Sequence, residues 1–186
     1  PKFARLVRAI WAYEGRGRTA SALKLMALLF PRPGELRKAT WSEIDLNRST
    51  WTIPAERMKM RREHKKPLPP AALEILMDLR GRNDPADLVF PAMTKPDRPM
   101  SENTMNLALQ RLGFSGDEMT PHGFRASAST FLNESGLWNS DAIEAELAHV
   151  DTKSARSIYN RAKYWTERVA MMNWWAEHVV RQTNAR

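Results

Sequence analysis

The segment spanning residues 20–30, ASALKLMALLF, constrains the fold of this chain more than any other stretch. Its residues are apolar on nearly every side of a helix, and such a helix is stable only when other elements surround it. Pro31 and Pro33 follow directly, and proline ends a helix because it lacks a backbone N–H and clashes with the preceding turn. We therefore predict a buried helix that stops just before Arg32.

Helical patterns also dominate most of the remaining chain. Apolar spacing and capping residues predict helices over 2–14, 71–80, 101–112, Thr120 to Gly136, Ser140 to about His149, Asp151 or Thr152 onward, and 164–182. Ser101 and Thr120 are expected to be N-caps, with Pro121 at the first helical position.

Residues 39–69 have a different pattern. ATWSEIDL and STWTIP are short β-rich runs separated by a polar turn, and a third short strand is expected around Lys66 to Pro69. The fold class that follows is mostly α with a small antiparallel three-stranded sheet.

The charge balance bears on the class of partner. The chain has 29 Lys and Arg residues against 21 Asp and Glu, a net charge of +8. This excess favours a polyanion such as DNA or RNA, although a basic protein without such a partner has the same composition.

The absence of cysteine excludes disulfides and thiolate-bound metals, and no apolar run reaches the roughly 18 residues of a membrane span. The first residues, PKFARLVRAIW, lack an initiator Met and a signal peptide, so we expect the chain to begin inside a longer protein.

A basic segment, RMKMRREHKK at residues 57–66, lies between two of the predicted strands. We call it the basic finger; it contains six Lys or Arg residues in ten positions. Like charges repel one another unless an anion is near, so the alternative of a merely solvated loop is less favoured here than for most charged segments, and DNA binding is expected. The predicted DNA contacts are Arg57, Arg61, Arg62, Lys65 and Lys66.

Two positions are suited to binding a phosphate. Arg32 lies between two prolines on a stiff backbone, although a surface ion pair with Glu35 is an alternative. His122 and Arg125 are three positions apart at a predicted helix start, where backbone N–H groups also favour an anion. A capping histidine and a salt-bridged arginine are the alternative there.

His149 and Tyr159 complete the candidate set. His149 is at a predicted helix end, where a cation is favoured. Tyr159 lies on an apolar stripe, so a core tyrosine with a hydrogen-bonded hydroxyl is the alternative to a nucleophile.

Taken in order, these residues resemble the catalytic pattern of the tyrosine recombinases of the phage integrase type. That pattern is an Arg in an R-x-x-E-L box, a Lys in a β-hairpin, H-x-x-R, a His or Trp, and a nucleophilic Tyr about ten residues later. All its positions are filled here, by Arg32, Lys59, His122, Arg125, His149 and Tyr159. RPGELR, WTIPAERMKM and PHGFRASAST resemble prophage integrases of enterobacterial islands in particular. The subgroup pattern H-x-V-P-L is altered, because Lys66 replaces its valine.

The resemblance implies the chemistry. Arg32 and Arg125 would stabilise the charge of the transition state with help from His149, and Glu35 would orient Arg32 or a neighbour. The Tyr159 hydroxyl would attack a DNA phosphodiester to give a 3′-phosphotyrosine, and Lys59 would protonate the leaving 5′-oxygen. His122 would assist the proton loss of Tyr159, with His149 as the less favoured candidate. No metal or cofactor is implied. Tyr164 and Tyr13 are rival nucleophiles, but the family spacing from His149 favours Tyr159.

The resemblance also implies an organisation. Residues 1–186 would be the catalytic domain of a longer integrase, without the arm-binding and core-binding domains, and the helix in 164–186 would dock in cis or in trans. The expected partners are double-stranded DNA attachment sites and an excisionase or host bending factor, with no membrane. We expect a homotetramer on DNA and a monomer for the isolated domain. The expected location is the bacterial cytoplasm, at the nucleoid. A non-catalytic DNA-binding module of the same fold and a type IB topoisomerase-like enzyme are the alternatives.

Overall fold

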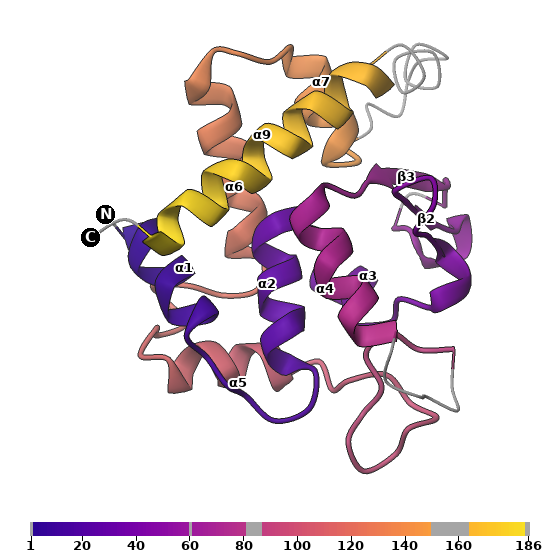
Figure 1. Cartoon of the computed structure of the whole chain (residues 1–186), viewed down its shortest axis with the longest axis vertical. Helices are drawn as coiled ribbons and strands as arrows, with labels where there is room; N and C mark the ends of the chain where they lie inside the picture. Colours follow the sequence, from indigo (N-terminus) through magenta and orange to yellow (C-terminus); the bar gives the residue numbers. More distant parts are fainter. Residues whose placement is uncertain (1, 60, 81–86, 150–163, 185–186) are drawn as a thin grey trace.

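The computed structural model describes residues 2–59, 61–80, 87–149 and 164–184. It is mostly helical with one three-stranded antiparallel sheet, which confirms the predicted fold class. The helix α2 (Thr19–Leu29) lies inside the bundle, and most of its side chains are buried. The helices α1 (Lys2–Trp11), α4 (Pro70–Arg80) and α9 (Trp165–Asn184) pack against it (Figure 1). The prediction of a surrounded apolar helix is therefore confirmed.

The sheet alternates between an inner and an outer face. Its strands β1 (Ile44–Asp45), β2 (Thr50–Ile53) and β3 (His64–Pro67) pair in that order, with short 3₁₀ turns at Trp41–Glu43 and Ala55–Arg57. Trp51 is opposite Lys66 and Ile53 is opposite His64 in the antiparallel register, and all four side chains are buried. Because side chains alternate along a strand, Lys65 instead points to the outer, exposed face.

The middle helices begin later than the sequence predicts. The helix α5 (Thr104–Arg111) has Asn103 rather than Ser101 as its N-cap. The helix α6 (Gly123–Ser135) starts three residues after Thr120, because the Gly123 N–H donates to the Thr120 carbonyl at 2.8 Å and closes a turn. Gly136 ends α6 in the left-handed conformation (φ 65°), as predicted.

The helices at the C-terminal side bring distant segments together. The helix α7 (Ser140–Glu146) packs against both α6 and α9. In α9, the Trp175 indole is fully buried and donates to the Ala27 carbonyl of α2 at 2.9 Å. The helix expected from Asp151 or Thr152 lies outside the described residues. Among the described residues, no helix is long and apolar enough to cross a membrane.

Candidate active site

Arg32 lies where α2 ends and α3 (Pro33–Arg37) begins. Phe30 ends α2 in the left-handed conformation (φ 39°), and Arg32 is the N-cap of α3. Glu35 contacts Arg32 twice: its Oε2 accepts from the Arg32 backbone N–H at 2.9 Å, and its Oε1 is 2.8 Å from Arg32 Nη1. Because the Glu35 side chain is 5% exposed and that of Arg32 is 24% exposed, the carboxylate holds the guanidinium on its buried side.

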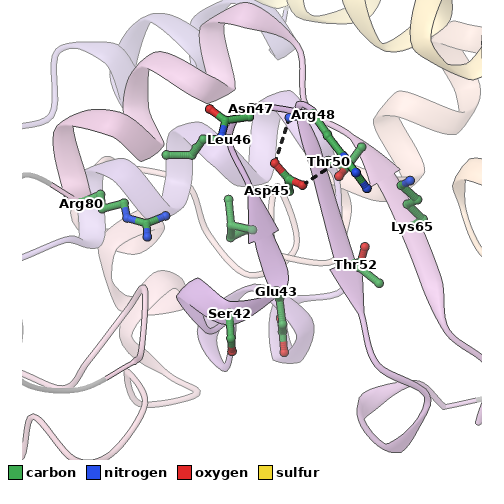
Figure 2. A pocket seen from close by; sticks show the side chains of 11 residues that line it. Ser42, Glu43, Asp45, Leu46, Asn47, Arg48, Thr50, Thr52, Lys65 and Arg80 are labelled. Carbon is green, nitrogen blue, oxygen red and sulfur yellow. Dashed lines mark hydrogen bonds and ion pairs between the residues drawn. The ribbon is translucent and has the colours of Figure 1, made fainter.

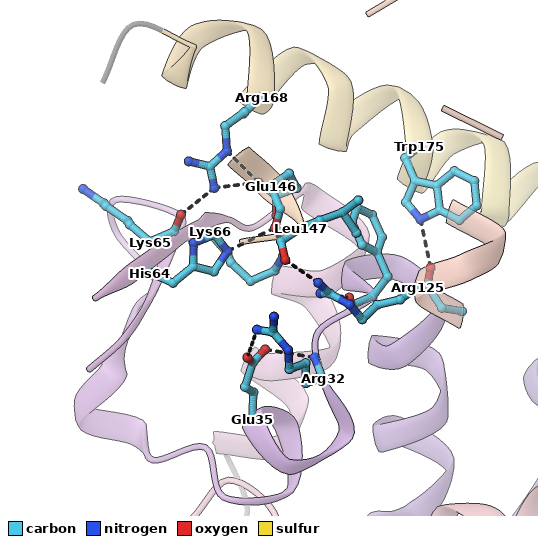
Figure 3. A network of polar contacts seen from close by, with 12 residues as sticks. Arg32, Glu35, His64, Lys65, Lys66, Arg125, Glu146, Leu147, Arg168 and Trp175 are labelled. Atoms are coloured by element: carbon cyan, nitrogen blue, oxygen red, sulfur yellow. Dashed lines mark hydrogen bonds and ion pairs between the residues drawn. The ribbon is translucent and has the colours of Figure 1, made fainter. Parts of the chain in front are cut away.

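Arg125 lies in the first turn of α6, and two distant backbone carbonyls hold its guanidinium. Nη1 donates to the Phe30 carbonyl at 3.3 Å, and Nη2 donates to the Leu147 carbonyl. Burial lowers the pKa of Arg125, and the positive charge of Arg32 lowers it further, so the two guanidiniums are within electrostatic range of each other (Figure 3). Two cations held in this way favour the binding of an anion.

His122 lies at the same helix start as Arg125. It is the N-cap residue of α6, with an exposed imidazole that makes no capping hydrogen bond. Its carbonyl accepts from the Arg125 backbone N–H at 3.1 Å, so both side chains belong to one helix start. The free N–H groups of such a start add to the preference for an anion.

His149 follows the end of α7, directly after Ala148 in the left-handed conformation (φ 49°). Its Nδ1 is 2.9 Å from Glu144 Oε2, and both side chains are about half exposed. The negative charge of Glu144 also raises the pKa of Arg125. The carboxylate that contacts His149 therefore lies within electrostatic range of Arg125.

Two members of the predicted set, Lys59 and Tyr159, remain. Lys59 is exposed in the basic finger, just after the turn at Ala55–Arg57. Tyr159 lies outside the described residues, so its prediction as the nucleophile stays a prediction. Of the rivals, Tyr13 packs against the hydrophobic core, and the Tyr164 hydroxyl donates to Asp141 Oδ2 at 3.4 Å.

The structure corrects two of the predicted DNA contacts. The Arg57 guanidinium points inward, with Nη1 at 2.7 Å from Glu43 Oε1 and Nη2 donating to the Glu35 carbonyl at 2.5 Å. Lys66 is 0% exposed, because strand alternation places it on the inner face of β3. Both side chains therefore bond within the protein and are not available to DNA. Arg61 and Lys65 are exposed and Arg62 is partly exposed, which leaves them as predicted DNA contacts.

Sequence reasoning missed a buried ionic network beside the site. The Glu146 carboxylate, at the end of α7, lies 2.5 Å from Lys66 Nζ and 2.7 Å from Arg168 Nη2 (Figure 3). Its members come from α7, β3 and α9. The replacement of valine by Lys66 was the one signal in the sequence, and it did not identify the partner.

A polar hollow of about 610 Å³ lies on the outer face of the sheet (Figure 2). Glu43, Asp45, Arg48, Lys65 and Arg80 are among the residues that line it, so its charge is mixed. It contains none of the predicted catalytic residues. Within the described part of the chain, no group of three or more His, Asp or Glu side chains is arranged to hold a metal ion.

Comparison with known sequences gives a family and close relatives. The model of the phage integrase family matches residues 4–165. Prophage integrase IntA of Escherichia coli K12 is 47% identical over 152 residues, which cover 82% of this chain and 36% of the relative. Prophage integrase IntZ of the same organism is 42% identical over 159 residues, which cover 86% of this chain and 39% of the relative. The chain therefore spans well under half the length of these relatives.

Comparison with solved structures supports the fold. An integrase from mycobacterium phage Brujita superimposes with a TM-score of 0.71 at 20% sequence identity. The superposition covers 98% of this chain and 62% of that one. At this identity the likeness establishes the architecture alone.

Proposed function

Because this chain belongs to the phage integrase family, we propose that it breaks and rejoins DNA at specific sites through a 3′-phosphotyrosyl intermediate at Tyr159. Its relatives are named prophage integrases, and the resemblance to that subgroup seen in the sequence is confirmed. The corresponding process is integration or excision of a prophage or genomic island.

One observation carries the proposal: Arg32 and Arg125, which are far apart in the sequence, are brought together, because Arg125 Nη1 donates at 3.3 Å to the carbonyl of Phe30, two residues before Arg32 (Figure 3). The in-line transition state of phosphoryl transfer concentrates negative charge on the nonbridging oxygens. Two guanidiniums fixed in advance stabilise that charge without reorganisation. Removing one such donor typically costs about 3 kcal/mol of transition-state stabilisation. His149 supplies a further hydrogen bond to the same phosphate.

The proton transfers are assigned to the remaining members. The Tyr159 oxygen attacks the phosphorus and forms the phosphotyrosyl ester, while the bond from phosphorus to the 5′-oxygen breaks. His122 accepts the phenolic proton, and Lys59 donates a proton to the leaving 5′-oxygen. A 5′-hydroxyl from another duplex reverses the steps. Because the ester keeps the bond energy, the reaction requires no nucleotide cofactor.

The partners follow from the same proposal. Arg61, Arg62 and Lys65 contact the DNA backbone, and the active assembly is a homotetramer on attachment sites, assisted by an excisionase or a host bending factor. The chain is the catalytic part of a longer integrase whose other domains bind the arm and core DNA. The helix α9 packs on its own chain through Trp175, and docking of the terminal segment on a neighbour remains a prediction.

A covalent-trapping experiment tests the proposal. The chain is incubated with a library of duplexes of varied sequence, each nicked so that the short released strand diffuses away after cleavage. We expect an adduct that survives denaturation in the unmodified protein, and peptide mapping should place it on Tyr159. The Tyr159→Phe variant should bind DNA and form no adduct, whereas Tyr164→Phe should form it normally.

The other outcomes discriminate the alternatives. DNA binding without any adduct indicates a non-catalytic module. Relaxation of supercoiled plasmid without sequence preference or strand exchange indicates a topoisomerase-like enzyme. An adduct that survives in Tyr159→Phe and disappears in Tyr164→Phe contradicts the assignment of the nucleophile.

A further inference from the structure

Glu146 is a fully buried carboxylate that contacts two other elements. Its Oε1 is 2.5 Å from Lys66 Nζ of β3. Its Oε2 is 2.8 Å from Arg168 Nε and 2.7 Å from Arg168 Nη2 of α9. Its backbone carbonyl also contacts His64 Nε2 at 3.1 Å and Lys66 Nζ at 3.3 Å. One residue at the end of α7 therefore links the sheet to the C-terminal helix.

Stability alone gives a weak reason for this network. Burying charges is costly, and apolar residues of similar volume often stabilise a fold as much as a buried ion pair does, or more. Here one carboxylate faces two cations, and burial is the largest effect that lowers the pKa of Lys66. Arg125 and Arg168 lower that pKa further while Glu146 raises it, so the network lies within electrostatic range of Arg125.

The network contacts both residues whose carbonyls hold Arg125. Leu147, which accepts from Arg125 Nη2, directly follows Glu146 and precedes Ala148 in the left-handed conformation (φ 49°). Phe30, which accepts from Arg125 Nη1, has φ 39° and its ring lies 5.0 Å from Lys66 Nζ. Non-glycine residues at such φ values persist only when their surroundings hold them.

The same carboxylate holds the first turn of α9, which begins soon after Tyr159 in the sequence. Arg168 Nη2 also donates to the Lys65 carbonyl at 2.7 Å, so the start of α9 is tied to β3 as well (Figure 3). The elements that flank the segment of the predicted nucleophile are thus joined through Glu146.

From this geometry we propose that Glu146 is a positioning residue for DNA cleavage. Its carboxylate, shared by Lys66 and Arg168, fixes the carbonyls that aim the Arg125 guanidinium at the scissile phosphate. The proposal rests on the proposed function for the cleavage step. Its claim about the geometry of Arg125 can be measured without any reaction.

The test compares Glu146→Gln with Glu134→Gln, an equal charge change at an exposed position of α6. Single-turnover cleavage of a saturating nicked duplex should slow about 10- to 100-fold in Glu146→Gln, because small displacements of a fixed catalytic group have effects of that size. Affinity for DNA, measured in a Tyr159→Phe background, should change less than about threefold, since the lost interaction acts in the transition state. Glu134→Gln should match the unmodified protein in both.

A second variant covers the case in which Glu146→Gln fails to fold. Lys66→Met combined with Glu146→Gln removes one charge of each sign and leaves Arg168 an amide oxygen to bond. This pair should fold and cleave within about tenfold of the unmodified protein, because it buries one cation without a counter-charge and not two. Equal slowing of the single and double variants contradicts the proposal, as does a loss confined to DNA affinity.

An NMR measurement separates this proposal from the proposed function. The Arg125 guanidinium signals of the 186-residue chain, assigned with Arg125→Lys, should shift or broaden in Glu146→Gln, in the double variant less, and in Glu134→Gln not at all. Unchanged Arg125 signals in a folded Glu146→Gln protein overturn the proposal. Shifted signals in a protein that never cleaves DNA uphold the role of Glu146 in holding Arg125 and reject the proposed function instead.

Discussion

Lys65 and Lys66 are neighbours in one strand, yet they belong to two different parts of the molecule. Lys65 is exposed on the outer face of the sheet, with its ammonium 5.1 Å above the Trp165 ring. Lys66 is 0% exposed and is bonded to Glu146 on the inner face. A run of basic residues is therefore no uniform DNA-binding surface, because strand alternation divides it between the solvent and the protein framework.

The largest expected difference between the two parts is in stability. Glu146→Ala leaves Lys66 and Arg168 buried without a counter-charge, so we expect it to lower the free energy of unfolding by about 3–5 kcal/mol. Lys65→Ala should stay within about 0.5 kcal/mol of the unmodified protein, because it removes an exposed charge. Urea denaturation of the two variants measures both values, and a similar loss in each would remove the distinction.

A second contrast lies at the base of the basic finger. Arg57→Ala should cost about 1.5–3 kcal/mol of unfolding free energy, because Glu43 and the Glu35 carbonyl lose a charged donor. Arg61→Ala, at an exposed position of the same finger, should leave stability within about 0.5 kcal/mol. Thermal unfolding compares them, and a stable Arg57→Ala protein would return Arg57 to the predicted DNA contacts.

For DNA binding, we expect the exposed lysine to matter more than the buried one, the opposite of their order in stability. Lys65→Ala should reduce the slope of log K against log salt by about 1, as expected for one lost phosphate contact. In Lys66→Met the slope should be unchanged, since that ammonium does not reach the solvent. Titrations at several salt concentrations measure the slopes, and a reduced slope in a folded Lys66→Met protein would place Lys66 on the DNA after all.

The smallest effect concerns His178 of α9, which stacks against the Trp174 and Trp175 rings. Burial lowers the pKa of His178, and the nearby charge of Arg181 lowers it further. The unfolded state therefore binds more protons in the window between the lowered pKa and the ordinary value of about 6.5. Stability should rise slightly with pH through that window, and His178→Gln should flatten the rise in denaturation curves measured at pH steps. A rise of equal size in the variant would assign it to another group.

Much of the fold was accessible from the sequence because its signals are local. The all-round apolar segment of α2 and its two following prolines fixed both burial and the helix end. Gly136 likewise marked the end of α6. Thr120 failed as a cap because Thr and Pro also suit a tight turn, and only the Gly123-to-Thr120 hydrogen bond distinguishes the two.

The candidate site was only partly accessible for the same reason. Arg32, Glu35 and Arg125 carry a recognisable local context, and the structure brings the two arginines together. Glu146 has no such context, because it bonds Lys66 across 80 positions and Arg168 across 22. The basic finger was treated as one charged segment, so the strand alternation that buries Lys66 was not considered. In the structure, Lys66 is paired with the buried Trp51.

The most direct measurement of the central claim is a crystal structure of the Tyr159→Phe chain bound to a duplex captured in the trapping experiment. We expect one phosphate of the cleaved step to accept hydrogen bonds from both Arg32 and Arg125, at about 2.7–3.1 Å. A scissile phosphate bound elsewhere, for example at the polar hollow on the outer face of the sheet, or contacted by neither arginine, would contradict it.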